Sequence, residues 1–285
     1  QGTADAVYQN LHLVTLYDAD RVAIFAADHI YKMDVDQMME YHMNKKAEIT
    51  VAANVVPRSE ASAFGCINTD ETGRIIGFIE KPENPPEIPG KPGFTYVSMG
   101  NYIFEREILE ESLIEDALLP TSHDFGRDII PKLVGSSRVF AYDFCTNVLP
   151  GQQHSFWRED KPYWKDVGTI RAYWDAHMDL LKHDSEMTFY NPQWPIRTVS
   201  YADPPSYVCP VKGYTCSVQS TLSAEGSRVL GSTVENSVLS RNCVIMPGSS
   251  VQESIIGEGV VIGENCRLKK VIIDSHNIVP ANTVM

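Results

Sequence analysis

The chain has 285 residues, 43% of them hydrophobic and 21% charged, a composition typical of a globular protein with room for one large domain and a smaller one. Its formal net charge of -13 argues against a broad nucleic-acid-binding surface, because such surfaces take most of their affinity from lysines and arginines that meet phosphates. No stretch approaches the roughly 20 apolar residues of a membrane-spanning helix, and residues 1–5 lack the basic and apolar regions of a signal peptide. We therefore expect two domains that bind neither nucleic acid nor a membrane, whereas a nucleotide bound together with a metal ion remains compatible with the charge.

The six cysteines show no CxxC pair and no histidine spacing typical of zinc. Most of them lie within apolar, strand-like runs. Reduced thiols are the simpler interpretation, since disulfides persist mainly in oxidising compartments. We therefore expect a cytoplasmic protein.

The first predicted elements alternate between helix and strand. Residues 3–14 carry apolar positions at helical spacing, and residues 22–27 form a short apolar run typical of a strand covered on both faces of a parallel sheet. A second helix is predicted over residues 34–47 and a second strand over residues 49–55. This order predicts a doubly wound α/β core with a right-handed crossover.

The same domain continues with a hairpin or edge excursion and then with further helices and strands. Its predicted strands are 64–68, 75–79, 97–104 and 138–144, its helices 108–118, 124–134 and 169–183, and its irregular, proline-rich loop 82–92. Helix N-caps are expected at Thr3, Asp34, Asp124 and Thr169. We therefore predict one α/β domain over residues 1–183.

Two isolated acids follow apolar, strand-like segments, namely Asp28 and Asp166. In open α/β sheets, ligands bind at the carboxyl ends of strands, so the two aspartates would share one divalent cation over a nucleotide. A lone aspartate after a strand also serves as a turn residue, and Asp166 would then support the helix that follows Thr169. The first interpretation outlines a phosphoryl- or nucleotidyl-transfer site, and both remain open at this point.

The last part of the chain has a six-residue period. Five of the six positions in one column are apolar, and the column reads Val238, Val244, Ser250, Ile256, Ile262 and Leu268. Such a period, with glycines and asparagines between the apolar positions, is typical of a parallel β-helix in which each side of a triangular coil takes one hexad. A string of short antiparallel strands is the alternative. We predict a linker over residues 184–212 and a β-helix domain over residues 213–285 whose last coil lacks its cap or docks on a partner.

Eight short motifs run along nearly the whole chain. They are GTADAV at 2–7, ADHIYK at 27–32, ASAFG at 61–65, FIEKP at 78–82, VSMG at 97–100, SHDFG at 122–126, YWKDVGT at 163–169 and WPIR at 194–197. Together and in this order they resemble bacterial ADP-glucose pyrophosphorylase, the glucose-1-phosphate adenylyltransferase family. One such motif would be weak evidence, whereas eight collinear motifs are highly specific.

The resemblance implies a Rossmann-like nucleotidyltransferase domain with a mostly parallel sheet, incomplete at its N-terminus, followed by a left-handed parallel β-helix of hexapeptide repeats. It implies the reaction of ATP with glucose 1-phosphate to give ADP-glucose and pyrophosphate, with Mg²⁺, in glycogen biosynthesis. It also suggests a homotetramer that is controlled by metabolites.

The resemblance also implies roles for individual side chains. Asp28 and Asp166 would hold Mg²⁺, and Lys81 would contact the phosphate of glucose 1-phosphate as a point charge. Glu80 would accept hydrogen bonds from the glucose hydroxyls. The alternative for Glu80 and Lys81 is a solvated ion pair beside the proline-rich loop.

Five further residues would lie close to the substrates. Gly65 and Gly100 would allow close approach of the backbone to the sugar, and Ser98 would donate a hydrogen bond to a sugar hydroxyl. Gly2 and Thr3, where backbone amides open a helix, would lie near the nucleotide.

Other polar and aromatic residues of the motifs are interpreted as structural. His29 and His123 are not needed as bases, because the attacking phosphate is already ionised, so we interpret both as structural or as supports of residues that contact the ligands. Trp164 would pack beneath the site, and Asp124 would either orient loops near the sugar or cap its helix.

The chain departs from the family pattern at three points. The glycine-rich, arginine-containing loop that would cradle the ATP phosphates is absent because the chain begins after it, Ala27 stands where the family usually has glycine, and Asn101 stands where an apolar residue is common. We therefore expect this chain alone to be a weak catalyst or inactive. The alternatives are another sugar-1-phosphate nucleotidyltransferase and a catalytically silent regulatory subunit, the latter favoured if Asp28 and Asp166 fail to meet.

Overall fold

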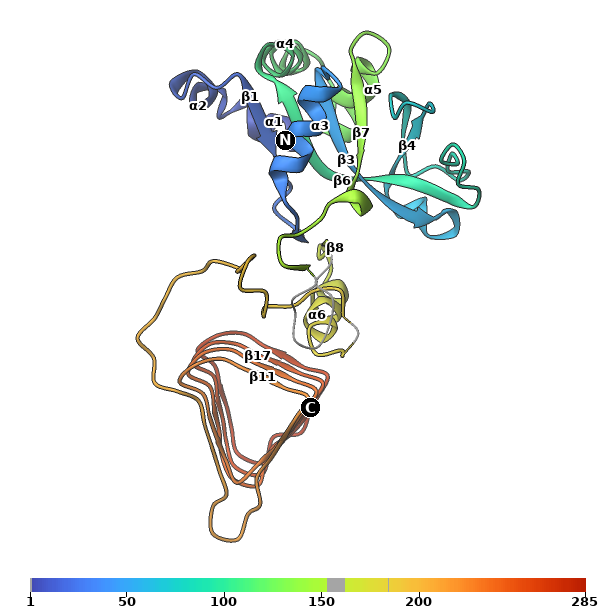
Figure 1. Cartoon of the computed structure of the whole chain (residues 1–285). Coiled ribbons are helices and arrows are strands. Elements are labelled where there is room, and N and C mark those ends of the chain that lie inside the picture. The colour runs from blue at the N-terminus through green and yellow to red at the C-terminus, as the bar shows by residue number, and fades with distance from the viewer. Residues whose placement is uncertain (1, 153–161, 184) are drawn as a thin grey trace. The chain divides into compact units, whose positions relative to one another are not determined.

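The computed structural model describes residues 2–152, 162–183 and 185–285, and they form two compact units. The first comprises Gln1–Ala27 and Tyr31–Leu149, and the second comprises Asp28–Ile30 and Pro150–Met285. Contacts thus group residues 150–183 with the β-helix, and the division at residue 183 stays a prediction. Figure 1 shows the sheet with its helices and the coils of the β-helix. No helix in the described ranges is long and apolar enough to cross a membrane.

The sheet of the first unit has the strand order β5-β4-β6-β3-β7, and β1 also pairs with β6. Among the described pairs only β3 and β7 run parallel, whereas β6 is antiparallel to β1, β3 and β4, and β4 is antiparallel to β5. The α/β class is confirmed, but the sheet is mixed rather than mostly parallel, because β6 runs against three neighbours. The strands are β1 (Arg21–Ile24), β3 (Ile49–Pro57), β4 (Gly65–Thr69), β5 (Ile75–Glu80), β6 (Phe94–Glu105) and β7 (Val139–Asp143).

Strand β1 differs from its expected environment. Its residues alternate between exposed and half-buried, so it is not covered on both faces. Arg21 lies opposite Glu105 of β6, and its Nε donates to Oε1 of Glu105 at 2.7 Å. The apolar run does form a strand, but this strand is antiparallel and not buried on both faces, because apolar composition does not reveal the partner strand.

Most of the predicted N-caps do lie at the start of a helix. Asp34 accepts from the amide of Asp36 and caps α3 (Val35–Asn44), and Thr169 accepts from the amide of Ala172 and caps α6 (Ile170–Asp179). Asp124 accepts from two amides at the start of the π-helix η2 (Phe125–Ile129), which continues into α5 (Ile130–Leu133). The helix α4 (Arg106–Ala117) follows β6 directly. These caps satisfy amides that no helix can pair internally.

The N-terminal helix differs from its prediction in two ways. It is split into α1 (Thr3–Tyr8) and α2 (Leu11–Leu16), because Asn10 leaves helical geometry at φ -115° and ψ 11°. Its N-cap is Gly2 and not Thr3, whose side chain forms contacts elsewhere. The expected cap was therefore wrong by one residue.

Helices lie on both faces of the sheet, as Figure 1 shows. On one face Ile49 and Val51 join a core with Leu109 of α4 and Phe125 of η2. On the other face Thr50, the residue between them in β3, meets His42 of α3. This alternation is the expected period of two along a strand.

The β-helix of the second unit has three parallel faces, with strand orders β10-β13-β16-β19, β11-β14-β17-β20 and β21-β18-β15-β12-β9. The predicted parallel coil is confirmed, and the antiparallel alternative is excluded for these strands. Its strands are β9 (Tyr207–Cys209), β10 (Ser217–Gln219), β11 (Leu222–Ser223), β12 (Arg228–Leu230), β13 (Thr233–Glu235), β14 (Val238–Leu239), β15 (Val244–Ile245), β16 (Ser250–Gln252), β17 (Ile255–Ile256), β18 (Val261–Ile262), β19 (Arg267–Lys269), β20 (Ile272–Ile273) and β21 (Ile278–Val279). The described residues between α6 and β9 form neither helix nor strand.

The coil is slightly shorter than three full hexads. Val229 pairs with Ile245, Ile245 with Ile262, and Ile262 with Val279, so successive coils advance by 16, 17 and 17 residues. One side of a coil therefore takes fewer than six residues, and a strict six-residue column drifts away from the core. Strand β9 already pairs with β12, before the expected start at residue 213.

The corners of the coil explain its glycines and asparagines. Asn242 and Asn265 have left-handed backbones at φ 59° and 57°, which asparagine tolerates better than most residues. A Cβ on Gly226 or Gly248 would overlap the side-chain oxygen of Asn242 or Asn265, respectively, in the next coil. Stacking of the corners therefore requires glycine at these two places.

Candidate metal centre and substrate-binding residues

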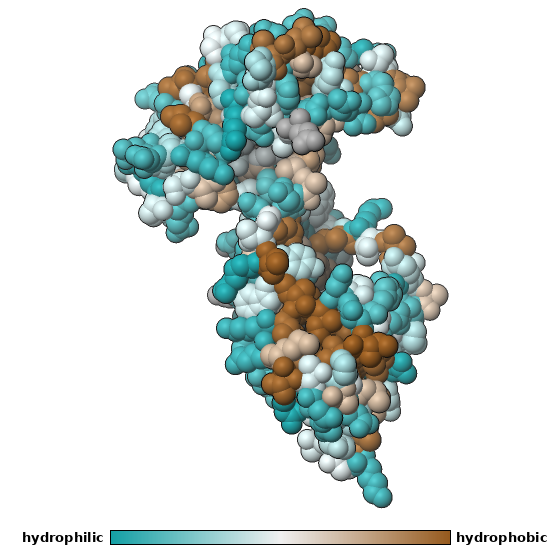
Figure 2. Space-filling model, turned by 180° about the vertical axis from the view of Figure 1, so that it is seen from behind, coloured by the Kyte–Doolittle hydropathy of each residue, from teal (hydrophilic) through white to brown (hydrophobic). Residues whose placement is uncertain are grey.

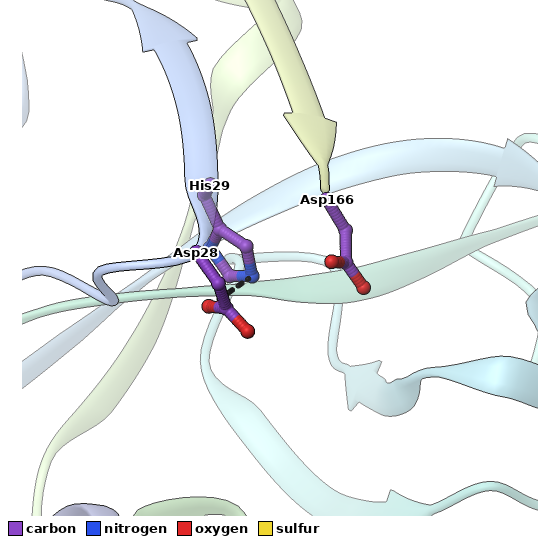
Figure 3. Close-up of side chains that lie close together, drawn as sticks. All are labelled: Asp28, His29 and Asp166. Carbon is purple, nitrogen blue, oxygen red and sulfur yellow. Dashed lines mark ion pairs between the residues drawn. The ribbon is translucent and has the colours of Figure 1, made fainter. Parts of the chain in front are cut away.

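Asp28 and Asp166, far apart in the sequence, lie together in the second unit. Asp28 immediately precedes β2 (His29–Lys32), and Asp166 ends β8 (Tyr163–Asp166), with which β2 pairs. One ligand atom each of Asp28, His29 and Asp166 lies within 4.8 Å of the other two. Figure 3 shows Asp28 and His29 side by side, with Asp166 across from them at the end of its strand. The structure thus brings the two predicted acids together.

Backbone groups hold this arrangement. The amide of Val167 donates to the carbonyl of Asp28 at 2.9 Å, and the amide of Gly168 donates to Oδ1 of Asp166 at 2.7 Å. Because Thr169 is the N-cap of α6, Asp166 is not needed for that role. Thr169 is thus confirmed as the cap, and Asp166 accepts from an amide that lies just before the helix.

The residues of this cluster fit a divalent cation. Two exposed carboxylates so close together repel each other unless a cation lies near them, and carboxylate oxygens are the preferred ligands of hard divalent ions. A Cβ on Gly168 would lie 3.1 Å from Oδ1 of Asp166 and 3.5 Å from Oδ2 of Asp28, so glycine keeps the space beside both carboxylates open. Sequence reasoning missed Gly168, although it stands two residues after a proposed ligand.

His29, expected to be structural or to support the site residues, belongs to the same cluster. Its Nε2 lies 3.6 Å from Oδ1 of Asp28, beyond hydrogen-bond distance. Its ring meets the Trp164 ring edge-on with centroids 5.1 Å apart, consistent with a packing role for Trp164. Its Nδ1 is buried and has no hydrogen-bond partner among the described residues.

Glu80 and Lys81 lie in the first unit, at the end of β5 and directly after it. The Lys81 amide donates to the carbonyl of Phe64 at 3.0 Å, and its backbone is left-handed at φ 51°. Lys81 Nζ is 4.0 Å from Oε1 of Glu80, with the two side chains 55% and 29% exposed. An ion pair this long and exposed contributes little to stability, so both groups remain free to bind a ligand.

The absence of a side chain at Gly65 leaves space for the Glu80 carboxylate and the Phe78 ring. It pairs with Glu80 across β4 and β5, and a Cβ on Gly65 would lie 2.9 Å from both Oε2 of Glu80 and the Phe78 ring. A Cβ on Gly126 would lie 3.6 Å from the same Glu80 oxygen and 3.4 Å from Oδ1 of Asp124. The Glu80 carboxylate thus lies between two glycines, of which sequence reasoning identified only Gly65.

Ser98 and Gly100 lie at an irregularity of β6, where the register with β3 shifts between Val51 and Ala53. The Gly100 amide donates to the Ser98 hydroxyl at 3.2 Å, and Gly100 has a left-handed backbone at φ 72°. Glycine is therefore required by the backbone at this position. Burial raises the pKa of the neighbouring Tyr102 to about 12, so its hydroxyl stays protonated.

Gly2 and Thr3 contact other residues of the first unit. A Cβ on Gly2 would overlap the carbonyl oxygens of Ser122 and His123. The Thr3 hydroxyl donates to Oδ2 of Asp124 and accepts from the Phe125 amide, both at 3.0 Å. These contacts tie the start of α1 to the segment before η2, and the expected proximity to a nucleotide stays a prediction.

Comparisons with known proteins agree with this architecture. The nucleotidyl transferase family matches residues 1–183, and the GlmU-like C-terminal hexapeptide family matches residues 204–285. The chain is 46% identical to glucose-1-phosphate adenylyltransferase 1 of Vibrio parahaemolyticus and 45% identical to glucose-1-phosphate adenylyltransferase of Photobacterium profundum, in each case over 100% of this chain and 69% of the relative. It is 44% identical to glucose-1-phosphate adenylyltransferase of Thermodesulfovibrio yellowstonii, over 98% of this chain and 66% of the relative. With these matches and its two-part fold, the chain belongs to the glucose-1-phosphate adenylyltransferase family of nucleotidyltransferases.

Proposed function

We propose that the protein transfers the adenylyl group of ATP to glucose 1-phosphate, giving ADP-glucose and pyrophosphate, in glycogen biosynthesis. The observation that carries the proposal is the convergence of Asp28 and Asp166 on one small space. The relatives named above, all glucose-1-phosphate adenylyltransferases, support it. Neither another sugar nucleotidyltransferase nor a silent subunit is favoured by an observation of comparable weight.

We propose that Asp28 and Asp166 hold Mg²⁺. A bound cation would offset the negative charge of the phosphates and help orient them. The Val167 amide joins the two acid-bearing segments, and the Gly168 amide orients the Asp166 carboxylate, before any ligand arrives. This order lowers the entropic cost of binding.

The remaining site residues bind and position glucose 1-phosphate in this proposal. Its phosphate is already ionised, so attack on the α-phosphorus of ATP requires alignment of two anions and no general base. Lys81 supplies a positive charge to that phosphate, and Glu80 and Ser98 bind sugar hydroxyls. Gly65 and Gly100 provide close approach of the backbone.

Other parts of the proposal follow from the family and from the fold. Gly2 and Thr3 lie near ATP, residues 1–183 and 213–285 are the functional domains with residues 184–212 between them, and the protein assembles as a homotetramer. A cytoplasmic location agrees with the six cysteines, all of which are unpaired.

Substitution of a proposed metal ligand tests the central claim through its effect on enzymatic turnover. Asp166→Ala should lower turnover more than 100-fold with little change in melting temperature, because the backbone contacts of β8 remain. Asp175→Ala removes another acid, on α6, and should retain activity. Turnover of Asp166→Ala within about threefold of wild type would refute the metal role.

A further inference from the structure

We propose that His29 is a third ligand of the metal ion held by Asp28 and Asp166, and that the centre therefore binds Mn²⁺ and Co²⁺ more tightly than Mg²⁺. This inference rests on the metal-binding role proposed above for the two aspartates and adds a nitrogen donor to it.

The positions of the three donors support this assignment. Donor atoms bound to one ion at roughly 2.1 Å lie about 3.0 Å apart at right angles and about 4.2 Å apart on opposite sides. Nε2 of His29 lies 3.6 Å from Oδ1 of Asp28, and the three ligand atoms of the cluster lie within 4.8 Å of one another. A small contraction would bring all three onto one ion. The same 3.6 Å separation is too long for a direct hydrogen bond between His29 and Asp28.

The surroundings of His29 preorganise its ring. The His29 side chain is 13% exposed, against 65% for Asp28, and it packs edge-on against Trp164. Both residues belong to the paired segments β2 and β8. A ring held in this way loses little freedom when it binds a metal.

The hydrogen bonding of the ring is also consistent with a ligand. Nδ1 has no partner in the described part of the chain, so no contact there turns the ring away from the acids. With a proton on Nδ1, Nε2 presents its lone pair towards the carboxylates. Three electron-pair donors that face one another repel, and a cation bound among them removes this electrostatic repulsion.

The donor set determines which metal is favoured. An imidazole nitrogen suits first-row transition ions, whereas Mg²⁺ prefers an all-oxygen set. Loss of His29 should therefore weaken Co²⁺ and Mn²⁺ binding about tenfold and Mg²⁺ binding less than twofold. Loss of either aspartate should weaken all three.

The test uses Mn²⁺ alone with the full chain. Binding is followed by the electron paramagnetic resonance signal of the free ion, and a directly bound nitrogen is detected by pulsed measurements of ¹⁴N coupling, which ¹⁵N-histidine labelling should alter. Wild type should show this coupling. His29→Phe keeps an aromatic ring beside Trp164, and it should lose the coupling and bind Mn²⁺ about tenfold more weakly.

A second histidine of the same unit provides the control. His177, on α6, forms a hydrogen bond with the carbonyl oxygen of Tyr173 and lies outside the cluster of Asp28, His29 and Asp166. His177→Gln should retain both the coupling and the affinity. Absence of coupling in wild type, or unchanged coupling and affinity in His29→Phe, overturns the role of His29. Unchanged Mn²⁺ affinity in Asp166→Asn overturns the metal role of the aspartates instead.

Discussion

The backbone amide of Val167 donates a hydrogen bond to the carbonyl oxygen of Asp28 at 2.9 Å. This bond joins the two acid-bearing segments through main-chain atoms, so their alignment does not depend on either carboxylate. Metal binding and folding are therefore separable by substitution at Asp28 or Asp166, which is what makes the proposed site testable.

Gly168→Ala should weaken metal binding about tenfold while the fold is retained. The added Cβ would lie 3.1 Å from Oδ1 of Asp166, closer than ordinary contact, so the carboxylate must move. Mn²⁺ titration compares the variant with wild type, and Gly135→Ala is the control because a Cβ there meets nothing within 4 Å. Equal affinities for wild type and Gly168→Ala would show that this space is not used by a metal.

Lys81→Gly should lower the affinity for glucose 1-phosphate at least tenfold without loss of stability. The change removes the charge, and glycine relieves a left-handed backbone that costs other residues about 1 kcal/mol. Calorimetric titration with glucose 1-phosphate measures the effect. Lys91→Ala, which removes an exposed lysine of the same unit, should bind the sugar phosphate normally. An unchanged affinity in Lys81→Gly would exclude Lys81 from the site.

Stability should fall as the pH is lowered from 7.5 towards 5. His42 is fully buried between Thr50 and Glu105, and burial lowers its pKa below the usual 6.5, although Glu105 partly opposes this shift. The unfolded chain therefore binds a proton that the folded chain does not, so stability is lost as the pH falls from 6.5 to the folded-state pKa.

Urea unfolding at pH 7.5, 6.5 and 5.5 measures this dependence. His42→Gln should be less stable at pH 7.5 and should depend less on pH, and His12→Gln, at an exposed histidine, controls for the loss of one imidazole. A His42→Gln variant with the wild-type pH dependence would contradict the assignment.

Asn101→Leu should stabilise the first unit by about 1–3 kcal/mol, the cost of burying polar groups without partners. Asn101 is fully buried on β6, and neither its side-chain nitrogen nor its oxygen has a hydrogen-bond partner in the described ranges. Asn147→Leu is the matched control and should destabilise, because buried Asn147 bonds to Asp34 and Tyr142. Denaturant unfolding of both variants measures the two effects, and a destabilised Asn101→Leu would contradict the assignment of Asn101 as an unpaired buried amide.

Local features were readable from the sequence because they depend on neighbouring residues. The caps Asp34, Asp124 and Thr169 bond to amides two or three residues ahead, so spacing alone identifies them. The hairpin of β4 and β5 was predicted from its turn for the same reason. The β-helix was predicted because apolar positions recur every six residues with glycines and asparagines between them, although side lengths other than six made the column drift.

Long-range contacts were not readable in this way. Motifs and periods are properties of the chain, so the family, the two kinds of architecture and the candidate acids Asp28 and Asp166 could be predicted from the sequence. The folded structure was needed to show that β1 is antiparallel to β6, that His29 joins the acids, and that Gly168 keeps the space beside them open. Which strands pair, and which side chains converge, depends on packing between segments far apart in the chain, and no local pattern encodes that choice.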